Sequence, residues 1–350
     1  MALLNYILRR LMILPLVMFL ITSAIFLLLL QLPVERRAEV YIPSVNPHLT
    51  DAQYEELIQA TIQRYGLNEP FYVQYSNWII NLFQGDWGFS PTWRQPVLEG
   101  LLRRLPASIE LGIFAMLPSV LLAFVFGRLA AKRHNRPSDY AVRSTAFIGW
   151  AMPNFIFGLI FMTVFYAWLN WFPAERMSTS VSLLVNSDNF RSYTGFLIID
   201  GILNGNYPVT WDAIRHLMLP GLTLAVFQWA LFVRIMRSSL LEEFNQDYIT
   251  TARSKGLSER MILEAHATRN AVLPVISSAG VAMSMLFGNV IVVEVLFNFN
   301  GIGRWAIESI QRFDAPVAIG FILLSSTISL AASLGTDILY AVADPRVTID

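Results

Sequence analysis

The sequence predicts an all-α membrane protein with six transmembrane helices. Of its 350 residues, 55% are hydrophobic and only 14% are charged, whereas about a quarter of a typical soluble chain is charged. Charge-free apolar runs recur along the chain, and a bilayer core of about 30 Å needs about 20 helical residues. The formal net charge is zero, which argues against broad attraction to nucleic acid. Cysteine is absent, which excludes disulfides, thiolate metal sites and cysteine nucleophiles.

The predicted spans follow from six apolar runs in the sequence. They are Leu11–Pro33, Leu111–Gly127, Ser144–Ala174, Leu217–Val233, Ala271–Val293 and Ala315–Thr336. The second and fourth runs are short, so we expect flanking residues to add a helical turn to each. Proline is expected to kink several of these helices, at Pro15, Pro118, Pro153 and Pro220.

The first run is predicted to be a retained helix rather than a cleaved signal peptide. Arg9 and Arg10 provide a basic start, but the apolar stretch exceeds the usual signal core of about 7–15 residues. No small-x-small cleavage site follows, since the sequence there is QLPVERR.

Six spans place both termini on one side of the membrane, together with the 128–143 and 234–270 loops. That side carries more of the lysine and arginine near span ends, although Arg36, Arg37, Arg103 and Arg104 lie on the other. Because such residues favour cytoplasmic loops, we expect both termini in the cytoplasm. The division that follows has four parts: an N-terminal tail and first span (1–33), an extracytoplasmic domain (34–105), a transmembrane core (106–340) with a cytoplasmic loop at 241–270, and a cytoplasmic tail (341–350).

The extracytoplasmic segment contains its own helix and turn signals. Thr50 begins a capping-box pattern, and the helix is expected to run to about Tyr65 and stop at Gly66. In the next stretch, PFYVQYSNWIINLF, the aromatic residues lie either at the membrane interface or in a small cap packed on the helices. GDWGFS at 85–90 predicts a tight turn with glycines at positive φ.

The sequence lacks the motifs of a catalytic, metal or nucleotide site. No G-x-S-x-G, HExxH or G-x-x-x-x-G-K-[ST] pattern occurs, and the histidines are scattered, at His48, His134, His216 and His266. We therefore expect no catalytic residues, no metal and no cofactor in this chain. If it moves a solute with ATP, another polypeptide must bind the ATP and magnesium.

Glu294, in VIVVEVLFNF, leaves two interpretations open. Most other charges gather at span ends, so the favoured interpretation is a pairing residue near the end of a span. The alternative is a proton relay, as an ion-driven carrier would need.

The polar segment DYITTARSKGLSERMILEAHATRNAVLP, residues 247–274, predicts two short helices joined by a tight turn. Asp247 is expected to cap the first helix, and Gly256 to end it in a left-handed conformation. Ser258 is expected to cap the second helix, with Leu257 and Ile262 as a hydrophobic staple.

This arrangement would project a compact knob into the cytoplasm, with a small apolar face of Tyr248, Ala252 and Leu257 at its tip. The alternative is an ordinary solvated loop. Paired start and stop signals favour the knob, because an unstructured connector does not need them.

The segment resembles the cytoplasmic loop of permease subunits in binding-protein-dependent ABC importers. It is most similar to the peptide subfamily, in which QDY-x-x-TAR-x-KGLS precedes a helix ending in RNA-x-LP. The general motif has Glu-Ala-Ala before the glycine, where this chain has Thr250-Thr251-Ala252, and 17 residues separate Gly256 from Pro274. Both features match the peptide-type variant.

The resemblance extends over nearly the whole chain. Further family-like stretches, in order, are YILRRL, GDWGFS, RLPASIELG, MPNFIFGL, HLMLPGLTLA, RSSLLEEFNQDY, VVEVLFNFNGIGR and DILYAVADPRV. One stretch departs from the family, since PVERRAEVYIP stands where a Gly-Asp-Pro turn is common.

The resemblance implies a type I ABC importer permease fold in a bacterial or archaeal inner membrane. It implies partners: a second homologous permease subunit, two cytoplasmic ATPase subunits that hold ATP and magnesium, and an extracytoplasmic solute-binding protein. The short helix before the glycine would dock on the ATPase. The coupling residues implied are Asp247, Tyr248, Ala252, Arg253, Gly256 and Leu257.

Two hypotheses of function follow. The first is ATP-driven import of peptides or a similar small solute, with this chain as half of the pathway. The second is an ion-gradient-driven carrier or channel that acts without an ATPase, motivated by Glu294 and the proline-broken spans. The sequence leaves open the solute, the residues that line the pathway, and whether the permease pair is homo- or heterodimeric.

Overall fold

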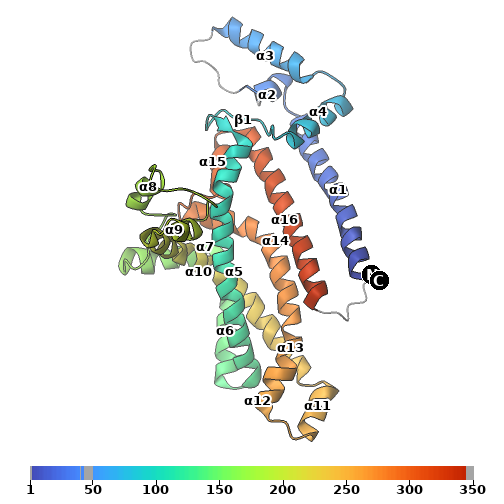
Figure 1. Ribbon diagram of the computed structural model, residues 1–350, viewed down its shortest axis with the longest axis vertical. Helices are drawn as coiled ribbons and strands as arrows, with labels where there is room; N and C mark the ends of the chain where they lie inside the picture. The colour runs from blue at the N-terminus through green and yellow to red at the C-terminus, as the bar shows by residue number, and fades with distance from the viewer. Residues whose placement is uncertain (1, 40, 43–49, 344–350) are drawn as a thin grey trace. The chain divides into compact units, whose positions relative to one another are not determined.

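The computed structural model describes residues 2–39, 41–42 and 50–343, and the side chains of 12, 15–39, 41–42, 50–283 and 288–336. These residues are mostly helical and divide into two compact units (Figure 1). Unit 1 consists mainly of Ala107–Asn300, and unit 2 of Asn5–Pro106 with Gly301–Ile328. The expected C-terminal tail lies outside the described residues from 344 onward, and so do the side chains of Arg9 and Arg10.

Unit 2 begins with α1 and contains a short β ribbon. Its elements are α1 (Ala2–Leu29), α2 (Val34–Glu39), α3 (Asp51–Tyr65), α4 (Phe71–Phe83), β1 (Phe89–Ser90), β2 (Gln95–Pro96) and α15 (Ile302–Gln311). Two long helices begin in unit 2 and end in unit 1, namely α5 (Val97–Lys132) and α16 (Ala315–Ala343).

The other helices of unit 1 include two π-helical segments, η1 and η2. They are α6 (Pro137–Ala151), α7 (Asn154–Phe161), η1 (Met162–Trp168), α8 (Thr179–Val185), α9 (Leu197–Leu203), α10 (Tyr207–Glu243), α11 (Asp247–Ser254), α12 (Glu259–Met261), η2 (Ile262–Ala267), α13 (Thr268–Ala271) and α14 (Leu273–Leu296).

The long apolar helices coincide with the predicted spans. Three helices are long and apolar enough to cross a bilayer, Val97–Lys132, Tyr207–Glu243 and Ala315–Thr336. Two bent pairs pass the same test together, Pro137–Ala151 with Asn154–Trp168 and Glu259–Met283 with Gly288–Leu296. A shorter apolar helix covers Pro15–Leu29. By length and composition the described residues thus provide three spans, or up to five if each bent pair is one.

The predicted run Ser144–Ala174 is broken rather than continuous. The chain bends by 103° between α6 and the α7–η1 helix. Met152 is extended, with φ −94° and ψ 138°, because the proline that follows disfavours a helical conformation at this position. Pro153 then starts α7, where its missing N–H costs no hydrogen bond.

Close packing against α10 and α14 holds α7 in place within unit 1. A Cβ at Gly158 would lie 2.4 Å from Leu296 and 3.3 Å from both Phe297 and Thr223, so no larger residue fits there without movement. The neighbouring apolar core includes Leu111, Leu217 and Val293, which are almost completely buried.

In unit 2 the predicted local signals are confirmed. Thr50 and Gln53 form a reciprocal capping box, and α3 ends at Gly66 with φ +60°. Gly85 and Gly88 have φ of +87° and +85° at the predicted turn, which leads into antiparallel pairing of β1 with β2.

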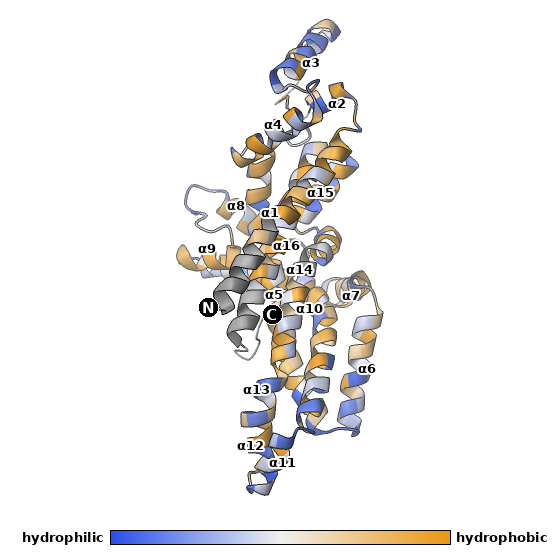
Figure 2. Ribbon diagram, turned by 90° about the vertical axis from the view of Figure 1, so that its right-hand side faces the viewer, coloured by the Kyte–Doolittle hydropathy of each residue, from blue (hydrophilic) through white to orange (hydrophobic). Residues whose placement is uncertain are grey.

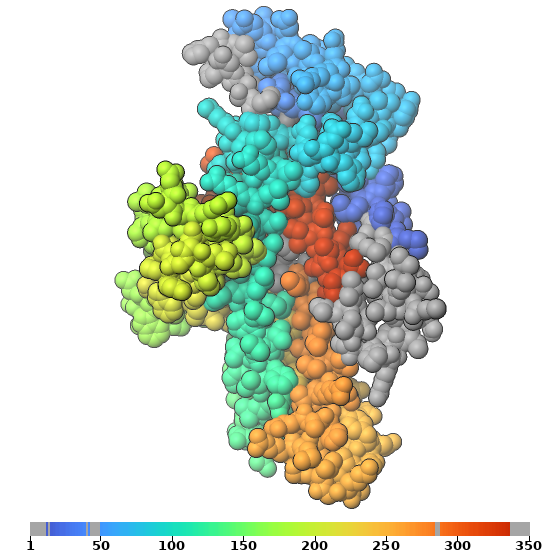
Figure 3. Space-filling model, in the orientation of Figure 1, coloured from blue at the N-terminus to red at the C-terminus, as the bar shows by residue number. Residues whose placement is uncertain are grey.

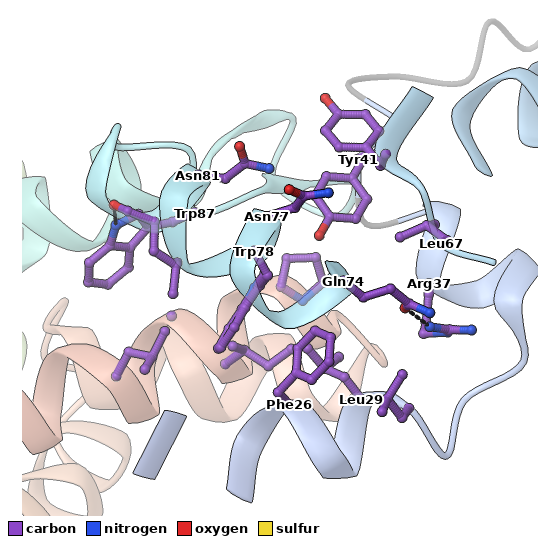
Figure 4. Close-up of a pocket in the computed structure, with 17 residues that line it drawn as sticks. Phe26, Leu29, Arg37, Tyr41, Leu67, Gln74, Asn77, Trp78, Asn81 and Trp87 are labelled. Atoms are coloured by element: carbon purple, nitrogen blue, oxygen red, sulfur yellow. Dashed lines mark hydrogen bonds between the residues drawn. The ribbon is translucent and has the colours of Figure 1, made fainter. Parts of the chain in front are cut away.

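The aromatic residues of α4 divide between the two alternatives, because Tyr75 and Trp78 pack against neighbouring helices whereas Phe71 and Tyr72 are 45% and 69% exposed. Trp78 is buried among Phe26, Leu323 and their neighbours, and the Tyr75 hydroxyl lies 2.8 Å from Thr22 Oγ1. Figure 4 shows Phe26 and Trp78 lining a small pocket of unit 2 together with Tyr41 and Trp87, where Arg37 Nη1 donates to Gln74 Oε1 at 2.6 Å.

Candidate functional site

The first helix of the predicted knob ends in a Schellman turn at Gly256. The Gly256 N–H donates to the carbonyl of Arg253 at 2.9 Å, and the Leu257 N–H donates to the carbonyl of Ala252 at 3.3 Å. Gly256 has φ +76°, which a residue with a Cβ adopts only at a cost. The predicted stop is confirmed.

The predicted cap at Asp247 is wrong by one residue. The N-cap is Gln246, whose backbone is extended and whose side chain makes no capping bond. Asp247 is instead the first helical residue, where its carboxylate lies near the positive end of the peptide dipoles. The acidic side chain therefore favours this helix start through the dipole rather than through a cap.

The second helix starts as predicted. The Ser258 hydroxyl accepts the Met261 N–H at 3.3 Å. Ile262 is fully buried, and Leu257 packs partly buried against the same apolar cluster, so the predicted staple residues lie on one core.

One face of the 247–271 segment is buried against the ends of α5, α6 and α10. The segment's buried apolar side chains are Ile249, Ala252, Ile262, Leu263, Ala267 and Ala271, and they join one cluster with the helix residues Ala130, Val142, Phe232, Met236 and Leu240. The segment is thus anchored to the helices. In the space-filling view it forms a lobe at one end of unit 1 (Figure 3), and hydrophilic residues gather over α11 to α13 (Figure 2).

The outward face of α11 is polar and differs from the predicted apolar tip. Ala252 is only 7% exposed and points into the core, so it cannot belong to an exposed face. Tyr248 is 37% exposed, and Asp247, Arg253 and Gly256 are also exposed. The exposed surface of α11 therefore consists mainly of polar side chains, together with Tyr248.

Ion pairs cross the turn and connect the segment to α5. Arg253 Nε donates to Glu259 Oε1 at 2.8 Å and Nη2 to Glu259 Oε2 at 3.3 Å. Glu264 lies 3.1 Å from Arg260 Nε and 3.9 Å from Arg128 Nη2 of α5. Arg128 is 25% exposed and the other members of these pairs are more exposed, so the pairs orient side chains more than they add stability.

Tyr248 is tied to both ends of the segment. Its hydroxyl donates to the Glu243 carboxylate and accepts from Asn270 Nδ2 at 3.2 Å. Burial, followed by the hydrogen bond to Glu243, raises the pKa of Tyr248 to about 12. The phenol therefore stays protonated and continues to donate at physiological pH.

The sequence reasoning missed three features of the segment. It gave Ile249 no role, although an apolar residue three positions before Ala252 is a helical core signal. It missed the π-helix η2. Directly after this helix, the Thr268 hydroxyl donates to the Leu263 carbonyl at 2.6 Å, five residues back. It also missed the Arg253–Glu259 pair, because a spacing of six residues meets only across the Gly256 turn.

A second polar cluster lies in the interior of unit 1, around Glu294. This residue is fully buried two positions before α14 ends, and Ser108 Oγ donates to its Oε1 at 2.5 Å. Nearby, Glu110 accepts the Ile198 N–H at 2.9 Å and lies 3.6 Å from Arg176 Nη2. The position of Glu294 near the end of α14 and its hydrogen bond from Ser108 agree with the interpretation of Glu294 as a pairing residue.

Within the part of the chain that the structure describes, no group of three or more His, Asp or Glu residues is arranged to hold a metal ion. The 247–271 segment combines a short helix, exposed polar groups and an inner face packed on the helix ends.

Comparison with known proteins identifies the family. Residues 123–349 match the family model described as the binding-protein-dependent transport system inner membrane component. The oligopeptide transport system permease protein AppB of Bacillus subtilis is 36% identical over 304 residues, which cover 87% of each chain. The di/tripeptide transport system permease protein DppB of Pseudomonas aeruginosa is 36% identical, over 82% of this chain and 83% of the relative. The dipeptide transport system permease protein DppB of Escherichia coli K12 is also 36% identical, over 81% and 82% of the two chains. The chain therefore belongs to the family of binding-protein-dependent transport system inner membrane components, as a permease subunit and not an enzyme.

Proposed function

We propose that this chain is one of two permease subunits in an ATP-driven importer of peptides, and that α11 with the Gly256 turn is where an ATPase subunit docks. The observation that carries the docking site is the anchored, polar-faced helix α11, whose inner residues Ile249 and Ala252 are buried on the helix ends. A docking element must be rigid if motion of a partner is to reach the spans. The peptide cargo is supported by the names of the relatives.

The assembly we propose contains a second homologous permease, two ATPase subunits that bind ATP and magnesium, and an extracytoplasmic solute-binding protein. This chain supplies no nucleotide site, so its part is mechanical. The described helices support six spans, because the apolar helix Pro15–Leu29 adds to the three long helices and the two bent pairs. With six spans both termini lie in the cytoplasm, on the same side as the 247–271 segment.

The docking proposal is tested by Gly256→Glu in the assembled complex. The turn has open space around a Cβ at this position, so the substitution strains the backbone and places a charge on the surface without a core clash. We expect membrane insertion and assembly to persist, while solute uptake per ATP hydrolysed falls by about tenfold or more.

Gly205→Glu is a matched control at the opposite end of α10. Gly205 has φ +65°, open space around its Cβ, and the same pair of Schellman hydrogen bonds, to Ile202 and from Asn206 to Gly201. We expect this variant to retain coupled uptake. Normal coupling in Gly256→Glu, or an equal loss in both variants, would contradict a docking role for the α11 turn.

The two hypotheses differ for the purified chain in liposomes without an ATPase. The carrier hypothesis predicts solute uptake under a proton or sodium gradient, whereas our proposal predicts no uptake. Gradient-driven uptake that Glu294→Gln abolishes would favour the carrier. The cargo is identified by purifying the complex with its binding protein and determining the retained ligand by mass spectrometry.

A further inference from the structure

A groove of about 580 Å³ lies between α6 and α10, at the end of unit 1 where these helices join the 247–271 segment. Its lining mixes basic and apolar side chains, since Arg143, Arg234 and Arg237 lie among Tyr140, Phe147 and Trp150.

The lining of the groove carries an excess of positive charge. Arg237 is neutralised by Asp139, to which it donates from Nε at 2.6 Å and from Nη2 at 2.7 Å. Arg143 and Arg234 make cation–π contacts instead, with the rings of Tyr140 at 5.7 Å and Trp150 at 5.1 Å. Among the described residues, neither has a carboxylate within ion-pair distance. Arg143 acts electrostatically on Asp139 from beyond that distance, so one carboxylate faces three guanidinium groups and the groove keeps a net positive charge that can bind an anion.

Arg143 and Arg234 lie where the apolar runs end. On α10 the run Leu217–Val233 stops at Arg234, and on α6 the apolar residues follow Arg143. Guanidinium groups at this level of a membrane helix lie among the lipid headgroups, and aromatic side chains are typical of the same zone.

The apolar side chains of the groove face outward. Phe147 is 73% exposed, Ile148 50% and Trp150 40%. A ligand that complements this lining combines an anionic group with an apolar tail. Inorganic phosphate and nucleotides lack the tail, and a neutral lipid lacks the charge.

We propose that the groove between α6 and α10 binds an anionic phospholipid, with Arg143 and Arg234 on its headgroup and with Phe147 and Ile148 along its acyl chain. Planar guanidinium groups bind phosphate by two parallel hydrogen bonds, and basic pockets between membrane helices are suited to such headgroups. Because the 247–271 segment packs on the same helix ends, the lipid would brace the helices that carry it.

The test uses the full chain, alone and with its partner subunits, in phosphatidylcholine nanodiscs with increasing phosphatidylglycerol. Retained lipid is counted by native mass spectrometry, and thermal stability is followed in parallel. We expect Arg143→Gln/Arg234→Gln to weaken retention of phosphatidylglycerol about tenfold. Arg133→Gln/Arg136→Gln removes the same charge from an exposed loop nearby and should stay within about twofold of wild type.

Four outcomes would overturn the proposal. They are equal retention in both double variants, equal binding of phosphatidylcholine, displacement of the lipid by inorganic phosphate, and exclusion of lipid from the assembled complex, which would make the groove a subunit interface. If the glutamine variant fails to fold, Arg143→Lys/Arg234→Lys replaces it. Lysine keeps the charge but lacks the planar set of guanidinium donors. We therefore expect this variant to retain less phosphatidylglycerol than wild type but more than background. Unchanged retention would contradict the guanidinium contacts.

Discussion

Gly256 and Asp200 show how single residues fix local geometry in this permease. Gly256 allows the left-handed turn that brings Arg253 and Glu259 together. Asp200 is almost fully buried and organises its loop by accepting four hydrogen bonds, from the Thr194 and Gly195 amides and the Ser192 and Thr194 hydroxyls. In each case one residue sets the path of a connecting segment.

Exchanging the charges of Arg253 and Glu259 distinguishes two roles of Arg253, namely closing the turn and contacting the proposed ATPase partner. Arg253→Glu/Glu259→Arg restores the ion pair but reverses the charge presented by α11. Because the pair is exposed, we expect an unchanged melting temperature. ATP-coupled uptake in proteoliposomes should fall about tenfold if Arg253 binds the partner. Full uptake in the exchanged variant would limit Arg253 to holding the turn.

Asp200 predicts a pH dependence of stability. Burial alone raises the pKa of Asp200, but the hydrogen bonds from Thr194, Ser192 and Gly195 outweigh it and hold the pKa below its ordinary value. A carboxylate with a lowered pKa stabilises the fold above its unfolded value of about 3.9, and this contribution is lost as the pH falls through the folded value.

We therefore expect Asp200→Asn to cost about 1–3 kcal/mol of unfolding free energy at neutral pH, because its amide group cannot accept all the donors. The difference from wild type should shrink as the pH falls below about 4. Unfolding in detergent at several pH values measures both, and Asp188→Asn, an exposed carboxylate of the same loop, is the control. A difference that is constant with pH would show that the charge of Asp200 is not responsible.

At the scale of elements, burial of one face fixes α11 to the spans. An isolated helix of 8 residues is not stable in water, so α11 depends on Ile249 and Ala252 packing against the ends of its neighbours. The bend between α6 and α7 has a similar origin, since Pro153 interrupts the helix and the packing around Gly158 holds the new direction.

Ile249→Ala should therefore loosen the 247–271 segment. The side chain is fully buried, and its truncation leaves a cavity that typically costs about 2–5 kcal/mol. Faster hydrogen exchange or proteolysis within 247–271 would report local loosening, with a lower melting temperature if the effect spreads. Thr250→Ala, next to it on the exposed face, should change stability by less than about 0.5 kcal/mol. Similar exchange rates in the two variants would contradict the anchoring role of Ile249.

At the scale of the whole molecule, the shared core of the 247–271 segment and the ends of α5, α6 and α10 predicts that they move together. The chain contains no cysteine, so spin labels can be placed on it at chosen sites, with partner subunits whose exposed cysteines have been replaced. In the assembled complex, distances between labels at Thr250 and Ala265, and between Thr250 and Lys132, should stay within about 2 Å when ATP replaces the nucleotide-free state. A constant first distance with a changing second one would indicate instead that the segment swings on a hinge at the end of α10.

The sequence by itself determined the helical membrane class, the positions of the apolar runs, the Thr50 and Ser258 caps, and the glycine turns at Gly66 and Gly256. These features depend on composition and on residues within a few positions of one another, so local physical chemistry decides them. The motifs also carried the family resemblance, which the comparisons confirm.

Only the tertiary structure decided that Ala252 faces the core, that Ser108 meets Glu294, and that Arg237 pairs with Asp139 while Arg143 and Arg234 lie over aromatic rings. The Ser108–Glu294 and Arg237–Asp139 pairs are separated by 186 and 98 positions in the chain. Hydrophobic patterning says that a face is buried but not which helix covers it. That choice depends on the shapes and volumes of all the packed side chains at once.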